Sequence, residues 1–426
     1  MELFYRVKTQ FCTLSTYLLA SIIPMVFSLI ANPFFAKNMS PTDYATVGYY
    51  TAFNSLITPL VNFYLIHYYT KRFFELKKQE LINFKATIFK LLIYFSIVLS
   101  ILALLGLYIY CSILNKNSNI PFFPYALISV LSIPISGIYT LTLVDYKMQR
   151  DSKRFFKLSV FTGILALLIG LFLVVFLKYG ALGKLSSILI SNIIIFIYCL
   201  FINKNLFKEK FDKSIFKKSI IFCFPLVIAS MLTFFSSGYD KVFLERVGNI
   251  VELGYYVVGV SIAGYINVFS NSINNTFQPD IYESVVKRNF IRCAKFIGLK
   301  LIIVFVIVFV FILLAPYIIN ILTAGRYIAS TKYAIIISFS TITSMMYYSV
   351  SQVTVAMGYT KITLINKIIG SLFSLLIFSF FIKKWGAIGA SWGVVLSFGI
   401  LFIGNVLLLL IYDRRKIRIK IHNLKK

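Results

Sequence analysis

The chain has 426 residues and a formal net charge of +29, and 59% of its residues are hydrophobic while only 13% are charged. These values exclude a soluble globular protein, in which about 45–50% of residues are apolar and roughly 25% are charged. An excess of Lys and Arg can indicate nucleic-acid binding. Here the basic residues lie between long apolar runs, so we expect no nucleic acid as a partner and predict an all-α polytopic membrane protein.

Twelve stretches are long and apolar enough to cross a bilayer, which requires about 20 residues in a helix. The first follows two basic residues, as in a signal peptide, but it is too long and lacks a cleavage site, so we interpret it as an uncleaved helix. The predicted spans are 10–36, 43–69, 86–112, 121–145, 156–178, 181–203, 218–240, 253–279, 294–318, 329–356, 362–382 and 386–412.

The basic residues are unequally distributed between the two sides of these spans. The side that holds both chain ends carries most of them, including the segment 203–218 and the tail 413–426. By the positive-inside rule both termini are cytoplasmic, and anionic membrane lipids are expected partners on that face. The loops of the opposite side hold only Lys37, Lys116, Lys178, Lys184, Lys241, Arg246, Arg326, Lys332, Lys383 and Lys384.

Cysteine and histidine usage gives no sign of a metal site or of a catalytic centre. The five cysteines show no paired spacing, and of the two histidines His422 lies in the tail. No zinc motif or disulfide framework is indicated, and we interpret the cysteines as small buried residues. We therefore predict that the protein has no cofactor and is not an enzyme.

Two short motifs occur twice at one spacing. Lys178-Tyr-Gly-Ala-Leu-Gly183 recurs as Lys384-Trp-Gly-Ala-Ile-Gly389, and Gly48-Tyr49-Tyr50 recurs as Gly254-Tyr255-Tyr256 with the same offset. Each copy contains an even number of spans, which predicts a parallel repeat with a substrate site between the copies and alternating access. The expected parts are an N-terminal six-helix lobe 1–202, a basic cytoplasmic linker 203–218, a C-terminal six-helix lobe 219–412 and a basic cytoplasmic tail 413–426.

Further motifs are spread along the chain: the segment from Pro33 to Tyr44, then Pro225, Asp240-Lys241, Gly254-Tyr255-Tyr256 and Pro279, and the two Gly-Ala-x-Gly elements. In their order and spacing they resemble Wzx-type O-antigen and polysaccharide flippases, the polysaccharide transporter family of the MOP exporter superfamily. The resemblance covers essentially the whole chain, and one departure is Ala45, where the family has Gly. The resemblance implies the twelve-helix, two-lobed fold shared with MATE transporters.

The resemblance also implies an activity, namely the transfer of an undecaprenyl-diphosphate-linked oligosaccharide across the bacterial inner membrane. The cargo would be an O-antigen or capsule repeat unit, carried from the cytoplasmic to the periplasmic leaflet in lipopolysaccharide or capsule biosynthesis. A proton or sodium ion as coupling cation, and contacts with other glycan-assembly membrane proteins, stay open. The alternatives are a MATE-like drug or cation exporter and, in a different class, a membrane glycan polymerase or ligase.

Ionisable residues inside spans are the first site candidates, because a charge at a helix centre costs roughly 2.5–3.5 kcal/mol. Asp240 and Lys241 lie near the outer end of the seventh span. Adjacent residues point about 100° apart on a helix, so we expect them not to pair with each other. Asp240 would bind a coupling cation or a base of the other lobe, and Lys241 an anionic group of the cargo. Alternatively, both extend to the headgroups.

The eighth span carries an unusual run of amides. Asn267, Asn271, Asn274 and Asn275 follow the i, i+4, i+7, i+8 spacing of one helix face. Together with Gln278, they are predicted to line the cavity and to bind sugar hydroxyls. The alternative is polar packing between helices.

Further basic candidates lie near the cytoplasmic side. Lys367 lies inside the eleventh span, while Arg6 and Arg72, at span ends, would attract a diphosphate. Positive-inside topology alone also explains such residues. For Lys90 and Lys300 we favour side chains that extend to the cytoplasmic headgroups.

Three titratable residues complete the candidates. His67, late in the second span, would change charge near neutral pH, although a packed histidine is the plainer interpretation. Asp145 lies near Lys147, and Asp280 near Lys287. Ordinary loop contacts are the plainer interpretation at these two positions, and salt bridges there would gate the cytoplasmic side.

Overall fold

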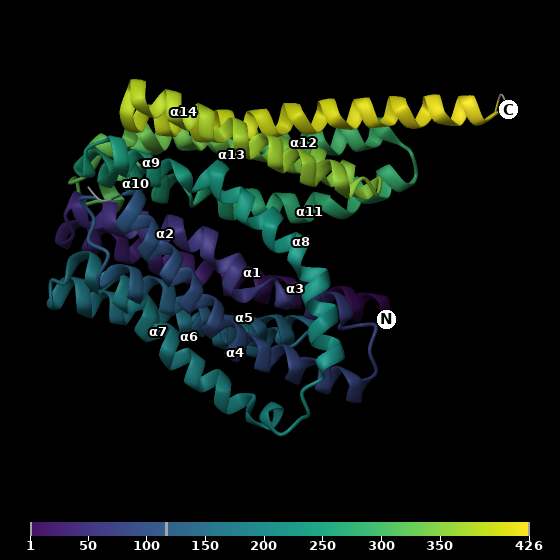
Figure 1. The fold of residues 1–426 in the computed structure, drawn as a ribbon, viewed down its shortest axis with the longest axis horizontal. Coiled ribbons are helices and arrows are strands. Elements are labelled where there is room, and N and C mark those ends of the chain that lie inside the picture. Colours follow the sequence, from purple (N-terminus) through teal and green to yellow (C-terminus); the bar gives the residue numbers. More distant parts are fainter. Residues whose placement is uncertain (1, 116–117, 425–426) are drawn as a thin grey trace. The chain divides into compact units, whose positions relative to one another are not determined.

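The computed structural model describes the backbone of residues 2–115 and 118–424, and side chains in this range except 2–18, 21, 78, 114, 360 and 413–424. The described residues form helices and no strands (Figure 1). By their internal contacts they divide into two units: unit 1 comprises residues 1–231 and 321–326, and unit 2 comprises 232–320 and 327–426. The boundary falls within the long helix α8 (Lys213–Ser237).

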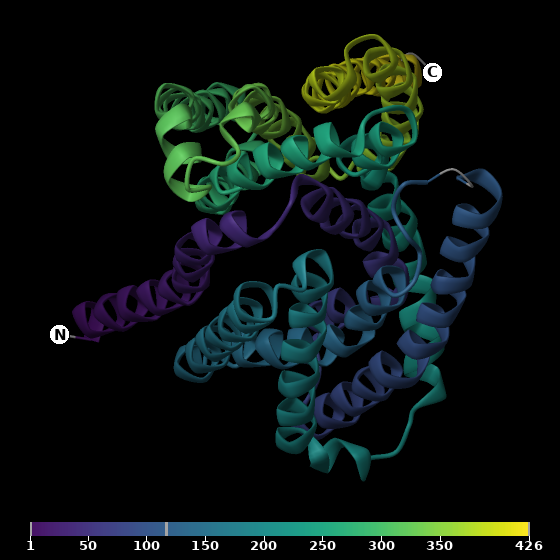
Figure 2. The same cartoon turned by 90° about the vertical axis from the view of Figure 1, so that its left-hand side faces the viewer.

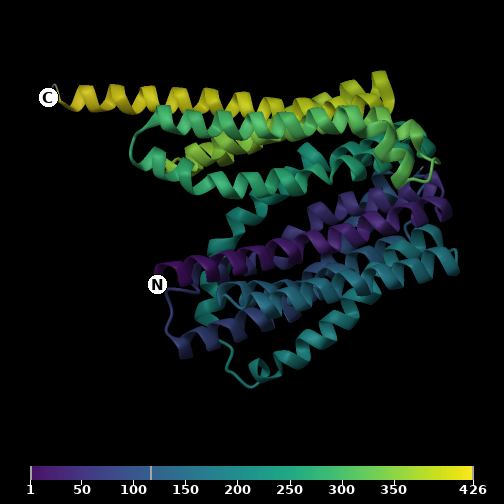
Figure 3. The ribbon, with the colours of Figure 1, turned by 180° about the vertical axis from the view of Figure 1, so that it is seen from behind.

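Unit 1 is a bundle in which α1 packs against α6, and α5 packs against α4 and α7 (Figure 3). Large aromatic residues such as Tyr69 and Phe89 are buried in its core together with Cys199 and Cys223. The helices are α1 (Glu2–Asn38), α2 (Pro41–Asn62), α3 (Leu65–Arg72), α4 (Lys78–Ile109), η1 (Tyr110–Leu114), α5 (Tyr125–Met148), α6 (Ser152–Leu171), η2 (Phe172–Phe176), α7 (Gly180–Ile202) and η3 (Lys204–Phe207).

The second predicted span is interrupted. Ser40 begins α2 with a capping box, because its side chain accepts a hydrogen bond from the backbone of Asp43 while the Asp43 carboxylate accepts one from the Ser40 backbone. The helix ends at Phe63 and Tyr64, which both adopt left-handed backbone angles with φ of 46° and 53°. The chain then resumes as α3, so a helix of 22 residues and one of 8 residues replace one continuous span.

Unit 2 contains the other helices, and its longest helix is bent back on itself. Gly386 has non-helical backbone angles and divides α14 into two arms, which lie side by side in Figure 2. Asn366 Nδ2 in the first arm donates a hydrogen bond of 2.8 Å to the Leu401 carbonyl oxygen in the second. The helices are α9 (Tyr239–Val247), α10 (Ile250–Ala263), α11 (Ile266–Val286), α12 (Phe290–Leu322), η4 (Ile328–Ser330), α13 (Thr331–Ala356) and α14 (Thr360–Leu424).

Each predicted span coincides with one helix or with two consecutive helices. Within the described residues, nine helical stretches are long and apolar enough to cross a membrane. One of them, Lys361–Tyr412, contains both the eleventh and the twelfth predicted span. The first two predicted spans are not among the nine: α2 has 22 residues but is not apolar enough, and α1 is recognised only over Ile22–Asn38, within the part where its side chains are described.

Candidate functional site

A polar site begins where α8 ends. Gly238 leaves helical geometry with φ of −138° and ψ of −35°, and α9 restarts at the next residue. This break places Asp240 in the first turn of α9, where it is completely buried. An acidic residue in a first helical turn is favoured by the helix dipole.

Asp240 is held by two neighbours through one of its carboxylate oxygens. The Tyr256 hydroxyl donates a hydrogen bond to Oδ2, and Lys241 Nζ lies 3.3 Å from the same oxygen. The expectation that Asp240 and Lys241 do not pair was therefore wrong, because the flexible Lys side chain bends back to its neighbour. Asp240 Oδ1 is buried and has no hydrogen-bond partner in the described part of the chain, which leaves it available to a cation or donor.

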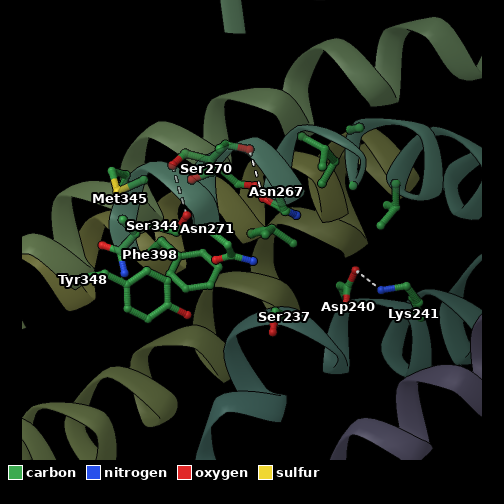
Figure 4. A pocket seen from close by; sticks show the side chains of 18 of the residues that line it. Ser237, Asp240, Lys241, Asn267, Ser270, Asn271, Ser344, Met345, Tyr348 and Phe398 are labelled. Carbon is green, nitrogen blue, oxygen red and sulfur yellow. Dashed lines mark hydrogen bonds and ion pairs between the residues drawn. The ribbon is translucent and has the colours of Figure 1, made fainter. Parts of the chain in front are cut away.

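Asp240 and Lys241 line a cavity of about 350 Å³, called here the unit 2 cavity. Figure 4 shows Asn267 and Asn271 of α11 facing it, opposite the α9 pair. Asn274 completes the amide row, while Asn275 is exposed and, like Gln278, does not line the cavity. Hydroxyl groups supply the remaining polar lining: Ser237, Ser270, Ser340, Thr341, Ser344 and Tyr348.

Lys300 of α12 was missed as a site residue. It is fully buried rather than extended to the headgroups, so that expectation was wrong. Its Nζ lies 2.7 Å from Asn274 Oδ1 and 3.4 Å from Gln352 Oε1, and Gln352 Nε2 also donates to Asn274 Oδ1 at 3.1 Å. Because an ammonium only donates hydrogen bonds, Lys300 fixes the Asn274 amide with its oxygen turned toward α12. The sequence signal for a buried Lys300 would have been the amide residues Asn274 and Gln352, which lie in neighbouring spans and can accept hydrogen bonds from its ammonium group.

Replacing Lys300 with Met is expected to leave the protein as stable as before or more stable, while lowering transport several-fold. No carboxylate of the described residues lies within ion-pairing distance of Lys300, and an unpaired buried charge is costly, so an apolar residue of similar length removes a destabilising group. Thermal unfolding and a transport assay on the same preparation check this. Equal loss of both would mean that Lys300 acts only in folding.

Lys367 lies apart from the unit 2 cavity. Its Nζ donates to Thr233 Oγ1 at 3.2 Å, and it lines a separate space of about 20 Å³. Tyr348 and Phe398 line both spaces. Lys367 is not among the residues that line the unit 2 cavity.

The two acidic residues predicted to form gates have other partners. Asp145 is buried in unit 1 and accepts hydrogen bonds from Tyr69 at 2.5 Å, Lys85 at 2.6 Å and Gln149 at 2.9 Å. Asp145 therefore pairs with Lys85 and not with Lys147, because residues two apart lie on different helix faces. Near Asp280, Lys287 pairs with Glu283 instead.

The remaining candidates lie in unit 1. His67 lines a groove of about 750 Å³ and stacks on Tyr64, with ring centroids 4.4 Å apart. Arg72 forms an exposed ion pair with Glu75 and does not line that groove. Arg6 lies in α1, and its side chain falls outside the described side chains. Lys90 reaches the backbone carbonyl of Glu209 in the linker.

The internal repeat is visible as matching contacts in the two units. In unit 1, Asp43 Oδ1 accepts the N–H of Ala181, in the first Gly-Ala-x-Gly element, at 2.9 Å. In unit 2, Glu252 Oε1 accepts the N–H of Ala387, in the second element, at 3.3 Å. The glycine before each alanine has a positive φ, 49° at Gly180 and 55° in the second element. A carboxylate thus caps the same helix start in both copies.

No group of three or more His, Cys, Asp or Glu side chains that could hold a metal ion occurs among the described residues. The polar groups of unit 2 instead suit a ligand that offers both hydroxyl groups and charge. One buried carboxylate, one adjacent ammonium and three amides line a single space. Such a lining is costly in a membrane protein unless the groups meet one another, water or a ligand.

Comparison with known proteins agrees with this description. The profile of a family described as "Polysaccharide biosynthesis protein" matches residues 13–283, and no curated protein matches the chain. An inward-facing multidrug resistance MATE family transporter of the MOP superfamily has a TM-score of 0.68 at 12% identity, covering 94% of this chain and 98% of that one. The lipid II flippase MurJ, in an inward closed conformation, has a TM-score of 0.66 at 16% identity, covering 92% of this chain and 86% of that one.

A third similar structure is a mutant form of the MATE transporter VcmN of Vibrio cholerae, with a TM-score of 0.56 at 14% identity over 96% of both chains. At these identities the structures show the fold, and the resemblance to MOP superfamily transporters is confirmed. The matched profile covers more than half of the chain. The chain is therefore a multi-pass membrane protein that belongs to the polysaccharide biosynthesis protein family and has the fold of MOP superfamily transporters.

Proposed function

We propose that this protein is a flippase that moves an undecaprenyl-diphosphate-linked oligosaccharide, such as an O-antigen or capsule repeat unit, between membrane leaflets. The observation that carries the proposal is a transporter fold in a chain of a polysaccharide biosynthesis family. The unit 2 cavity supports it, since amides and hydroxyls suit sugar groups and an ammonium suits phosphate or carboxylate oxygens.

The proposed direction is from the cytoplasmic to the periplasmic leaflet of the inner membrane, with both termini in the cytoplasm. The distribution of basic residues supports this orientation. Alternating access between two lobes would carry the headgroup across while the polyprenyl chain stays in lipid. Asp240 is the proposed site for a coupling proton or sodium ion, because its buried Oδ1 has no partner in the described chain.

Replacing Asp240 or Lys241 with Ala is expected to lower transport at least tenfold without preventing membrane insertion. Each substitution removes a polar group of the cavity and changes its charge by one unit. The assay is translocation by purified protein in liposomes that contain the lipid-linked oligosaccharide. Glu283→Ala, which breaks an exposed ion pair of α11, is the control and should transport normally.

The paired variant Asp240→Asn with Lys241→Gln separates transport from structure. If the ion pair only stabilised unit 2, removing both charges together would restore activity that the single changes lose. We expect the double variant to stay inactive. Full activity of either single Ala variant would remove these residues from the site, and export of drugs without any glycan transport would support the exporter alternative.

A further inference from the structure

The groove in unit 1 differs in chemistry from the unit 2 cavity. It measures about 750 Å³ and lies between α2, α3, α5 and α8, and no Asp, Glu, Lys or Arg is among its lining residues. Hydroxyl and amide side chains supply its polar lining: Thr51, Asn54, Thr58, Asn62, Ser136 and Thr140. The lining also includes the apolar side chains of Pro59, Ile66 and Val144, so the groove combines polar and apolar surface and carries no formal charge apart from the titratable His67.

The hydroxyl groups of this groove present mainly acceptor oxygens. Thr51 donates its hydrogen to the Val47 carbonyl at 2.7 Å, Ser136 to the Ile133 carbonyl at 2.7 Å and Thr140 to the Ser136 carbonyl at 2.9 Å. Because each donor is used within its own helix, the lone pairs of these oxygens remain for a ligand. A ligand that offers many O–H donors matches this lining, whereas a phosphate or carboxylate offers only acceptors.

An amide and an aromatic pair add two further elements. Asn62 lines the groove, and its Oδ1 is buried against Gly137 without a hydrogen-bond partner in the described residues. An unpaired buried acceptor is costly, and a ligand hydroxyl at Asn62 would relieve that cost. The left-handed turn at Phe63 and Tyr64 sets the stacked rings of Tyr64 and His67 on the groove wall, as a flat surface for the apolar face of a sugar ring.

We propose that the unit 1 groove binds uncharged sugar residues, through hydroxyl donors to its Thr, Ser and Asn oxygens and through contact with Tyr64 and His67. This inference rests on the proposed function for the nature of the cargo. It assigns the neutral sugar residues of the cargo to the unit 1 groove, whose lining contains no Asp, Glu, Lys or Arg. An oligosaccharide with a neutral end is therefore the preferred cargo.

The proposal is tested by binding alone, with the full-length protein in lipid nanodiscs. The probes are the methyl glycosides of N-acetylglucosamine, which is neutral, and of glucuronic acid, which is anionic, with binding measured by saturation-transfer NMR titration. The neutral glycoside is expected to bind at millimolar concentration with an affinity that depends on the unit 1 groove, whereas binding of the glucuronide, whose carboxylate suits the ammonium of the unit 2 cavity, should not depend on the groove. A groove variant that weakens binding of both glycosides equally would overturn the proposal.

A matched pair of variants locates the binding. Thr140 and Thr276 are both exposed, and each donates to a carbonyl four residues back at 2.9 Å, but only Thr140 lines the groove. Thr140→Val should lower the affinity for the neutral glycoside about threefold to tenfold, the usual effect of one lost hydrogen bond. Thr276→Val should leave this affinity unchanged. Equal affinity of the two variants would overturn the proposal.

A second variant changes the groove without removing a polar group. An alanine Cβ at Gly137 would lie 2.9 Å from Asn62 Oδ1, so Gly137→Ala should turn that amide and weaken the glycoside. Thermal unfolding with Thr276→Val as reference shows that the variant is folded. Displacement of the glycoside by a polyprenol that carries no sugar would indicate a lipid groove and overturn the proposal.

The outcomes for the groove and for the flippase are distinguishable. Glycoside binding is measured without translocation, and Asp240→Ala lies in the other unit, so this variant should still bind the neutral glycoside as the parent protein does. Binding without any translocation by the parent protein would contradict the flippase and leave the groove intact. If the parent protein translocates its cargo but neither Thr140→Val nor Gly137→Ala weakens glycoside binding, the groove proposal alone is contradicted.

Discussion

Gly389→Ala is expected to prevent correct folding of unit 2. An added Cβ would lie 2.0 Å from the carbonyl oxygen of Phe381, a backbone atom of the first arm of α14. Because a backbone atom cannot move away as a flexible side chain can, the substitution should lower the free energy of unfolding by about 3 kcal/mol, the upper end for overpacking. Thermal unfolding of detergent-solubilised protein, followed by size-exclusion chromatography, measures the loss of folded protein.

The control lies in the same arm of α14. Gly399 has no atom within 4 Å of an added Cβ, and Ala is about 1 kcal/mol more favourable than Gly within a helix. Gly399→Ala should therefore unfold at the same or a higher temperature. If Gly389→Ala behaved like Gly399→Ala, the close packing of the two arms at the second Gly-Ala-x-Gly element would be wrong.

Lys85→Met is expected to destabilise unit 1 by about 3–5 kcal/mol, the usual result of breaking a buried ion pair. Asp145 would keep its hydrogen bonds from Tyr69 and Gln149 but would become a buried charge without a counter-ion. Thermal unfolding measures the change. Replacing Lys85 and Asp145 together with Met and Leu should recover much of the stability, because no charge is then left unpaired.

Arg72→Met is the matched control for this prediction. Arg72 and Glu75 form an ion pair of which both side chains are more than a third exposed, and such pairs contribute about 0–1 kcal/mol. Equal destabilisation by Lys85→Met and Arg72→Met would contradict the buried network around Asp145.

Hydrophobic length predicted the fold well, because each apolar run of the sequence must cover the same membrane thickness. The interruptions within runs were not predicted. The helix break at Phe63 and Tyr64 involves neither Gly nor Pro at those two positions. Gly238 marks the break before α9, but other spans also contain glycines that do not interrupt a helix. Local sequence carries little signal for such breaks, since packing of the neighbouring helices stabilises them.

The candidate site could be predicted only in part. The helical spacing correctly grouped Asn267, Asn271 and Asn274, which line one cavity. It also included Asn275, although i+8 lies at the margin of the face. Lys300 belongs to this site through a contact 26 positions away in the chain, and its burial depends on tertiary packing that no local pattern encodes.

The leaflet distribution of the lipid-linked oligosaccharide tests the central claim most directly. In cells that lack the protein, the undecaprenyl-diphosphate-linked repeat should accumulate on the cytoplasmic leaflet, and the parent gene should restore its appearance on the outer leaflet while the Asp240→Ala variant should not. A membrane-impermeant enzyme that modifies only sugars on the outer leaflet provides the readout. Arrival of the repeat at the outer leaflet at a normal rate without the protein would contradict the flippase function.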